Sequence, residues 1–100
     1  MEPSENLGTR MMLENDCIRV WEHRVPPGGT GPMHIHRRPY LSIVVQGSPG
    51  DTLGPDGEVL EHFELTSGSA LWFGDEHLPE THALRNTGGD EILIVTTEFL

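Results

Sequence analysis

Short apolar runs separated by turn residues limit what this chain can fold into. The runs are rich in β-branched and aromatic residues and cover 17–25, 33–36, 40–46, 59–65, 70–73, 81–86 and 91–98. No heptad repeat and no long amphipathic helical pattern competes with them. Strands of this length, with turns roughly every 8–12 residues, are typical of an all-β sandwich or barrel.

The segments between these runs carry turn signals. Residues 26–32 combine Pro and Gly, which favours a loop. Residues 53–58 contain Pro-Asp-Gly, which predicts a tight turn between two strands. We expect a flexible N-terminal segment at 1–9 and one domain at 10–100, because no linker, repeat or low-complexity tract marks a second domain.

The acidic net charge and the absence of lysine limit which partners the chain can bind and which reactions it can catalyse. The formal net charge is −10, which disfavours nucleic acid and anionic membranes as partners. The chain has no lysine, which excludes Schiff-base catalysis and P-loop phosphate binding. All basic residues are arginines, whose guanidinium groups remain available to bind a carboxylate or a phosphate.

Two further features bear on the compartment. No apolar run approaches the roughly 20 residues of a membrane span, and the acidic N-terminus lacks the pattern of a signal peptide. We therefore expect a cytoplasmic location. Cys17 is the only cysteine, which excludes an internal disulfide, and we expect it to be a small, buried apolar side chain.

His34 and His36 form a His-x-His pair in a short extended run. On a strand, such side chains project from the same face, about 7 Å apart at the backbone, so two imidazoles can converge on one ion. Taken alone, the pair fits two surface histidines better than a metal site.

The spacing around this pair resembles the first motif of the cupin superfamily. In that motif a Gly, a His-x-His pair, an acidic ligand and a second Gly follow one another at fixed intervals. Gly28, His34, His36 and Gly47 stand at those intervals.

The second cupin motif ends in His-xxx-Asn, which His82 and Asn86 supply after a turn at Gly68. The chain thus resembles a small single-domain cupin of the cupin 2 conserved barrel type, similar to small bacterial cupins linked to β-alanine degradation. The resemblance implies a single β-barrel, or double-stranded β-helix, of the jelly-roll type. It also implies a metal site whose ligands are His34, His36 and His82.

The sequence departs from the cupin pattern in two places. Tyr40 stands where the family has a glutamate ligand, and Gly74 stands where the second motif has a proline. The segment that leads to His82 is also longer and more acidic, at 75–80. Three neutral imidazoles with open positions suit one divalent ion of Fe, Zn, Ni, Cu or Co, and suit Mn less because the carboxylate is missing.

Other side chains are candidates for a role beside the ion. Tyr40 can hydrogen-bond a bound water or a substrate, or it can be a core aromatic. His77 can ligate, move a proton or lie in solvent. A carboxylate of residues 75–80 can replace the missing ligand or belong to a solvated face. For His23 and His62 we expect surface or structural positions.

The run at 40–46 has apolar residues on both faces. Leu41, Ile43 and Val45 project from the face opposite Tyr40. A small barrel buries only its inner face, so the outer stripe needs a cover, and a second copy of the chain is the simplest one. We expect a homodimer.

Two functions of different classes fit these features. The cupin resemblance implies a metal-dependent enzyme, dioxygenase-like or isomerase-like. It would act on a small polar or anionic metabolite that an arginine holds at the mouth, while Tyr40 or His77 moves a proton. The alternative is a cupin module that binds or senses a small molecule or a metal without turnover. Open metal positions serve either function.

Overall fold

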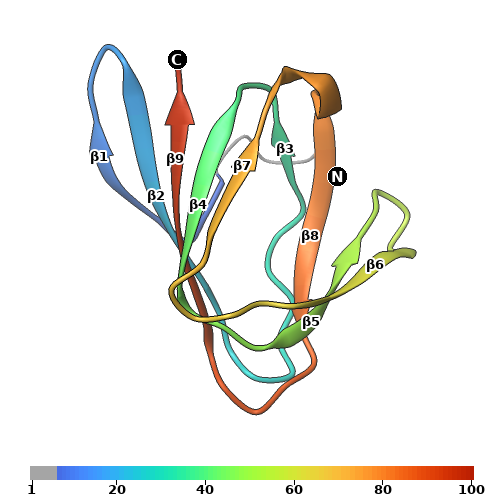
Figure 1. The fold of residues 1–100 in the computed structure, drawn as a ribbon. Coiled ribbons are helices and arrows are strands. Elements are labelled where there is room, and N and C mark those ends of the chain that lie inside the picture. Colours follow the sequence, from blue (N-terminus) through green and yellow to red (C-terminus); the bar gives the residue numbers. More distant parts are fainter. Residues whose placement is uncertain (1–6) are drawn as a thin grey trace.

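Two antiparallel sheets face each other across a central cavity in the computed structural model, which describes residues 7–100 (Figure 1). The first sheet has the strand order β1-β2-β9-β4-β7 and the second has the order β3-β8-β5-β6. The elements in chain order are β1 (Arg10–Glu14), β2 (Ile18–Val25), β3 (His34–His36), β4 (Tyr40–Gln46), β5 (Pro49–Leu53), β6 (Val59–Glu64), β7 (Ala70–Phe73), the 3-10 helix η1 (Asp75–His77), β8 (Glu80–Asn86) and β9 (Ile92–Phe99). The predicted all-β class is confirmed.

Every run that the sequence predicts as extended is a strand, with bounds that differ by at most one residue at each end. The turn within 53–58 is also confirmed: Gly57 has a φ of 81° and donates a backbone hydrogen bond to the carbonyl of Gly54. The sequence analysis assigned neither β1 nor β5. β1 is exposed at every residue, and β5 contains Pro, Gly and Asp, so neither carries the usual strand pattern.

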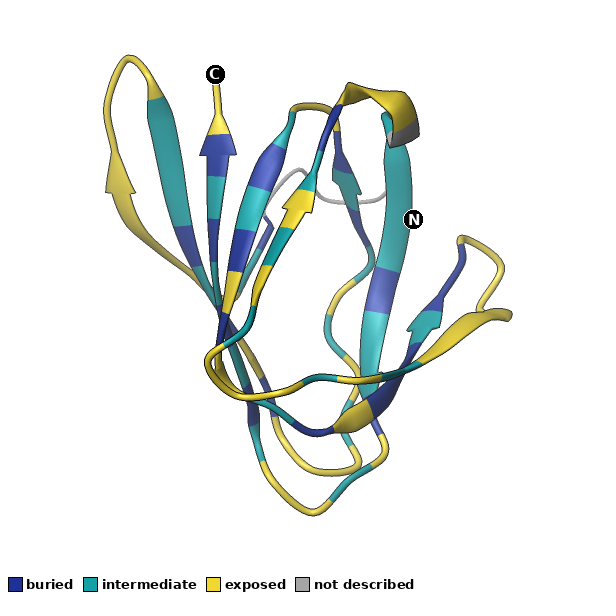
Figure 2. Cartoon of the chain, viewed as in Figure 1, coloured by how far each residue is buried: buried dark blue, intermediate teal, exposed yellow. Residues whose placement is uncertain are grey.

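Alternating burial along the strands decides which side chains face the cavity (Figure 2). The apolar core lies where β2 ends and β9 begins, around Val25, Ile92 and Ile94. The opposite ends of these strands reach the region of Tyr40, which pairs with Glu98 across the sheet. The core thus closes one end of the molecule and leaves the other end for polar side chains.

Asn86, the last residue of the second motif, holds the closed end together. Its side chain is fully buried, and its amide nitrogen donates to the carbonyl oxygens of Val25, at 3.0 Å, and Asp90, at 2.6 Å. Its amide oxygen accepts hydrogen bonds from the hydroxyl of Ser48 and the backbone nitrogen of Gly88. One asparagine therefore ties the end of β2 to the turn between β8 and β9.

The two glycines of the first motif each meet a backbone requirement. Gly28 has a φ of 75°, which favours glycine, and its nitrogen donates to the carbonyl of Asn86. At Gly47, a Cβ atom would collide with the carbonyl oxygen of Leu65. These motif positions therefore shape the fold and do not contact the candidate site.

Two expectations about single segments need correction or qualification. Cys17 is exposed, and the expected burial is wrong, because it lies in the turn before β2, where the Asn15 side chain accepts its backbone hydrogen bond. Of the segment expected to be flexible, residues 1–6 lie outside the described residues, while Leu7 is buried.

Within residues 7–100, no helix has the length and apolarity that crossing a bilayer requires. The cytoplasmic location stays a prediction.

Candidate metal centre

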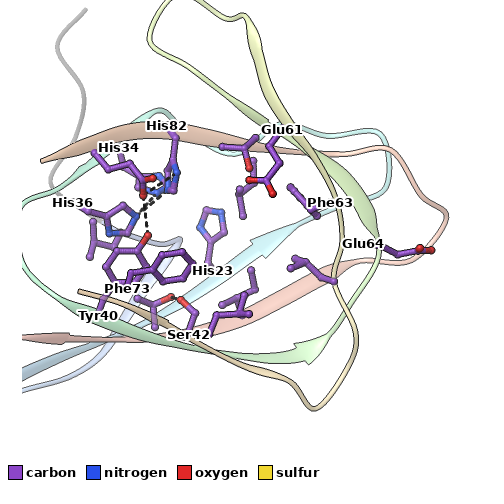
Figure 3. A pocket seen from close by; sticks show the side chains of 18 residues that line it. His23, His34, His36, Tyr40, Ser42, Glu61, Phe63, Glu64, Phe73 and His82 are labelled. Carbon is purple, nitrogen blue, oxygen red and sulfur yellow. Dashed lines mark hydrogen bonds and ion pairs between the residues drawn. The ribbon is translucent and has the colours of Figure 1, made fainter. Parts of the chain in front are cut away.

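Three histidines converge on the inner wall of the second sheet (Figure 3). His34 and His36 project inward from β3, and the antiparallel register places His82 of β8 directly opposite His34. The Nε2 atom of His36 lies 3.0 Å from the Nε2 atom of His34 and 3.0 Å from that of His82. The structure therefore brings together the three residues that the sequence predicts as ligands.

Hydrogen bonds around the cluster indicate which ring nitrogens carry protons. His34 Nδ1 lies 3.0 Å from the carbonyl oxygen of Pro32, an acceptor, so Nδ1 carries the hydrogen and Nε2 presents a lone pair. His82 Nδ1 lies 3.4 Å from a carboxylate oxygen of Glu80, a contact that favours a hydrogen on Nδ1 and a lone pair on Nε2, although the two atoms form no hydrogen bond. His36 Nε2 can donate to one of these lone pairs at most, so the cluster cannot satisfy itself by hydrogen bonding.

A shared cation would satisfy all three nitrogens. Two nitrogen ligands about 2.1 Å from one ion and at right angles to each other lie about 3.0 Å apart, which matches the spacing in the cluster. The residues present therefore fit a divalent transition-metal ion. His, Cys, Asp and Glu are the residue types that most often bind metal ions. Among the described residues of these types, the three cluster histidines are the group whose donor atoms lie close enough together to share an ion.

Burial keeps the three imidazoles neutral. His34 and His36 are each 3% exposed, and the His82 side chain is 12% exposed. Burial, reinforced by neighbouring imidazoles, lowers the pKa of His34 and of His82 to about 4 and that of His36 to about 2. The neutral imidazole is the form that binds metal, so the cluster is ready for an ion at neutral pH.

Tyr40 and Glu80 flank the cluster as a hydrogen-bonded pair. The Tyr40 ring stacks on His36, with centroids 3.8 Å apart, and its hydroxyl donates to Glu80 Oε1 at 3.0 Å. Burial, and then the Glu80 carboxylate, raises the pKa of Tyr40 above its usual range, so it remains a phenol. Glu80 comes from the long acidic segment, and it contacts His82 without joining the convergent donor set. A carboxylate in this place orients a ligating histidine.

A cavity of about 370 Å³ opens beside the cluster. Its walls are largely apolar and include Phe63, Leu65, Leu71, Phe73, Leu84 and Ile94. No arginine is among the described residues that line it, so the arginine expected at the mouth is wrong. Arg19, Arg37 and Arg38 instead surround a separate surface hollow with Glu98.

The remaining sequence candidates take different places. The side chain of His77 lies outside the described part of the chain, so its expected role stays a prediction. Asp75 and Glu76 are exposed. His62 is on the surface, as expected, and is paired with Asp51.

For His23, the sequence left a surface or a structural position open, and the structure excludes the surface position. It is 3% exposed and lines the cavity. The signal was available in the alternation of β2, because Trp21 and Val25, two positions to either side, are apolar and also buried.

Solved structures with the same fold include several that are described as cupins. Over the whole chain, this protein is 25% identical to a cupin domain from Bordetella pertussis, of which it covers 98%, with a TM-score of 0.76. It covers 56% of the polyketide cyclase RemF from Streptomyces resistomycificus, with 85% of its own length aligned, 24% identity and a TM-score of 0.61.

A third solved structure is the DMSP lyase DddQ from Ruegeria pomeroyi. The alignment covers 86% of this chain and 40% of the lyase, at 17% identity and a TM-score of 0.61. No protein-family model matches the sequence, and a search of the curated proteins finds no match. The predicted double-stranded β-helix is therefore confirmed at the level of the fold.

Proposed function

We propose that this chain, which has the fold of cupins, holds one divalent transition-metal ion on His34, His36 and His82 and acts on an organic ligand in the adjoining cavity. The observation that carries the proposal is the convergence of three Nε2 atoms that have no mutually satisfying hydrogen bonds. Three protein ligands leave positions on the ion at which a ligand can bind.

The chain's own groups support catalysis beside such an ion. A bound divalent ion supplies Lewis-acid polarisation or oxygen chemistry, of the isomerase or dioxygenase class. Glu80 accepts a hydrogen bond from the Tyr40 hydroxyl and contacts His82, so a carboxylate and a phenol lie next to each other at the edge of the cavity. Such a pair can accept a proton from a ligand and return it. The apolar walls exclude water from the reacting groups.

The alternative is a binding or sensing module without turnover. Tyr40 lies between His36 and Phe73, with both rings stacked on it, and its hydroxyl is already engaged by Glu80. An aromatic side chain held in this way also serves purely to support the ligating histidines. Turnover therefore has to be tested separately from metal binding.

Metal analysis of the purified protein tests the binding step. We expect close to one equivalent of a divalent transition metal per chain. His34→Ala and His82→Ala should each lose most of it, because each removes one of three ligands. His62→Ala is the matched control, since this histidine is 82% exposed and lies outside the cavity. Full metal retention by the His34 and His82 variants would overturn the proposal.

Turnover is tested on the metal-loaded protein with a panel of small molecules. Oxygen uptake with Fe(II) reports dioxygenase activity, and NMR of ligand protons exchanging with deuterated solvent reports proton abstraction. β-Alanine and related amino acids belong in the panel, because the link to β-alanine degradation stays a prediction. Stoichiometric metal with no turnover across the panel would favour the binding module.

We also propose that the protein is a homodimer formed through the outer face of the first sheet. Apolar side chains remain exposed on three neighbouring strands of that face: Ile43, Val45, Trp72 and Phe99. The rings of Trp72 and Phe99 contact each other edge to face, with centroids 5.7 Å apart. A continuous apolar face of this kind favours association with a second copy.

A further inference from the structure

His23 is buried without a hydrogen-bond partner. Its side chain is 3% exposed, and neither Nδ1 nor Nε2 has a partner among the residues that the structure describes. The ring projects from β2 into the cavity (Figure 3). A buried polar group without a partner destabilises a fold, and such groups persist where a ligand completes them. An imidazole nitrogen of His23 is therefore available to a molecule in the cavity.

The position of His23 is beside the three-histidine cluster and distinct from it. Its ring meets that of His34 edge to face, with centroids 5.8 Å apart, and it does not belong to the convergent donor set. On its other side, the backbone at Gly31 comes so close that a Cβ there would lie 3.1 Å from His23 Nε2. The glycine backbone thus fixes where the imidazole stands next to the cluster.

The other cavity walls indicate which ligand chemistry fits. Most are apolar, and the hydroxyls of Ser42 and Thr96 bond each other at 2.9 Å. The charged side chains that line the cavity are carboxylates, among them Glu61 and Glu80. Away from the cluster, an anionic group would therefore meet negative charge and apolar surface, with no arginine or lysine among the described lining residues to stabilise it.

We propose that the cavity binds an uncharged, ring-sized organic molecule with oxygen functions at both ends, one end at the three-histidine cluster and the other hydrogen-bonded to His23. The inference rests on the metal-binding function proposed above and names its ligand class. It replaces the anionic metabolite expected from the sequence. A volume of about 370 Å³ is sufficient for such a molecule. His23 is then the residue that anchors the end of the ligand far from the ion.

Three related probes test the proposal by calorimetry on the Zn-loaded protein. Resacetophenone is an uncharged phenyl ketone with two hydroxyls, ortho-hydroxyacetophenone lacks the distal hydroxyl, and 4-acetyl-3-hydroxybenzoate replaces the distal hydroxyl by a carboxylate. We expect resacetophenone to bind about tenfold more tightly than ortho-hydroxyacetophenone, the effect of one hydrogen bond. We expect 4-acetyl-3-hydroxybenzoate to bind more weakly than resacetophenone, because its carboxylate lies away from the cluster.

Variants at His23 connect this preference to the residue. The His23→Phe variant should bind resacetophenone and ortho-hydroxyacetophenone about equally well, with its metal content unchanged. The His23→Gln variant keeps a hydrogen-bonding group and should retain part of the preference for the distal hydroxyl. An unchanged preference in His23→Phe, or tighter binding of 4-acetyl-3-hydroxybenzoate than of resacetophenone, would overturn the proposal. Loss of metal from His23→Phe would also overturn it, because His23 would then hold the ion.

Failure of the proposed function gives a different result. If the wild-type protein holds no metal, the metal site is wrong, and the preference for the distal hydroxyl, measured on the metal-free protein, still reports on His23. Retention of that preference in the wild type and its loss in His23→Phe would support the anchoring role alone.

Discussion

Four imidazoles line one small cavity in a neutral state: His23, His34, His36 and His82. Burial is the main reason why the pKa values of these histidines are lowered, because the charged form of each ring would lose its hydration. Only His82 has a carboxylate, that of Glu80, close to a ring nitrogen. The same property that prepares the cluster for a cation makes the metal-free protein sensitive to acid.

We expect the metal-free protein to lose stability as the pH falls from about 6.5 to about 4. The pKa of His23, His34 and His82 is about 4 in the folded chain against 6.5 as the model value, so the unfolded chain binds protons first. The free energy of unfolding therefore decreases as the pH is lowered, by up to about 1.4 kcal/mol per histidine for each pH unit between about 6.5 and about 4.

Urea denaturation of chelator-treated protein at about pH 7 and pH 5.5 measures this effect. The carboxylates of Glu22 and Asp51 also have lowered pKa values, through their arginine partners, but their contribution is lost only as the pH falls below about 4.5. A free energy of unfolding that does not change between pH 7 and 5.5 would contradict the assignment of buried, neutral histidines.

Among the secondary-structure elements, the short strand β3 carries two of the three cluster histidines, and it depends on β8 for its position. Elsewhere in the fold, the turns between strands include glycines of two kinds. At Gly47, a Cβ would collide with the Leu65 carbonyl oxygen, whereas Gly89 has open space around its Cβ position. Substitutions at these two glycines should therefore differ sharply.

We expect Gly47→Ala to destabilise the protein by about 2 kcal/mol or more, because a backbone carbonyl must shift to admit the methyl group. Gly89→Ala is the matched control and should change the free energy of unfolding by less than about 0.5 kcal/mol. Thermal unfolding of both variants in the metal-free state provides the measurement. Equal effects of the two substitutions would refute the packing role of Gly47.

Strands with a clear alternation or a run of β-branched residues could be predicted from the sequence, and the resemblance to the two cupin motifs implied the convergence of the cluster. β1 and β5 could not, because β1 has no buried side and β5 is held by its neighbours on both edges. The place of Glu80 depends on the long acidic segment folding back onto Tyr40, and no residue spacing encodes that contact.

At the scale of the whole molecule, the described residues leave an apolar outer face on the first sheet exposed. Its exposed apolar residues contrast with a net charge of −10, which by itself keeps two copies apart. Association of two copies therefore has to come from apolar burial over that face.

We expect light scattering after size-exclusion chromatography to return twice the 11.1 kDa mass of the chain. Ile43→Glu should give the monomer, because it places a charge within the apolar face. Val59→Glu is the matched control, since Val59 is similarly exposed, at 43% against 38%, but belongs to the other sheet. A monomeric wild type, or dissociation by Val59→Glu as well, would refute the proposed interface.

The division of the polar groups between the two sheets has a mechanical consequence. All three cluster histidines belong to the second sheet, whereas His23 belongs to the first. An ion alone would therefore link only β3 and β8 and would not restrict the relative motion of the two sheets. An organic molecule that reaches from the ion to His23 would connect the two sheets and restrict that motion.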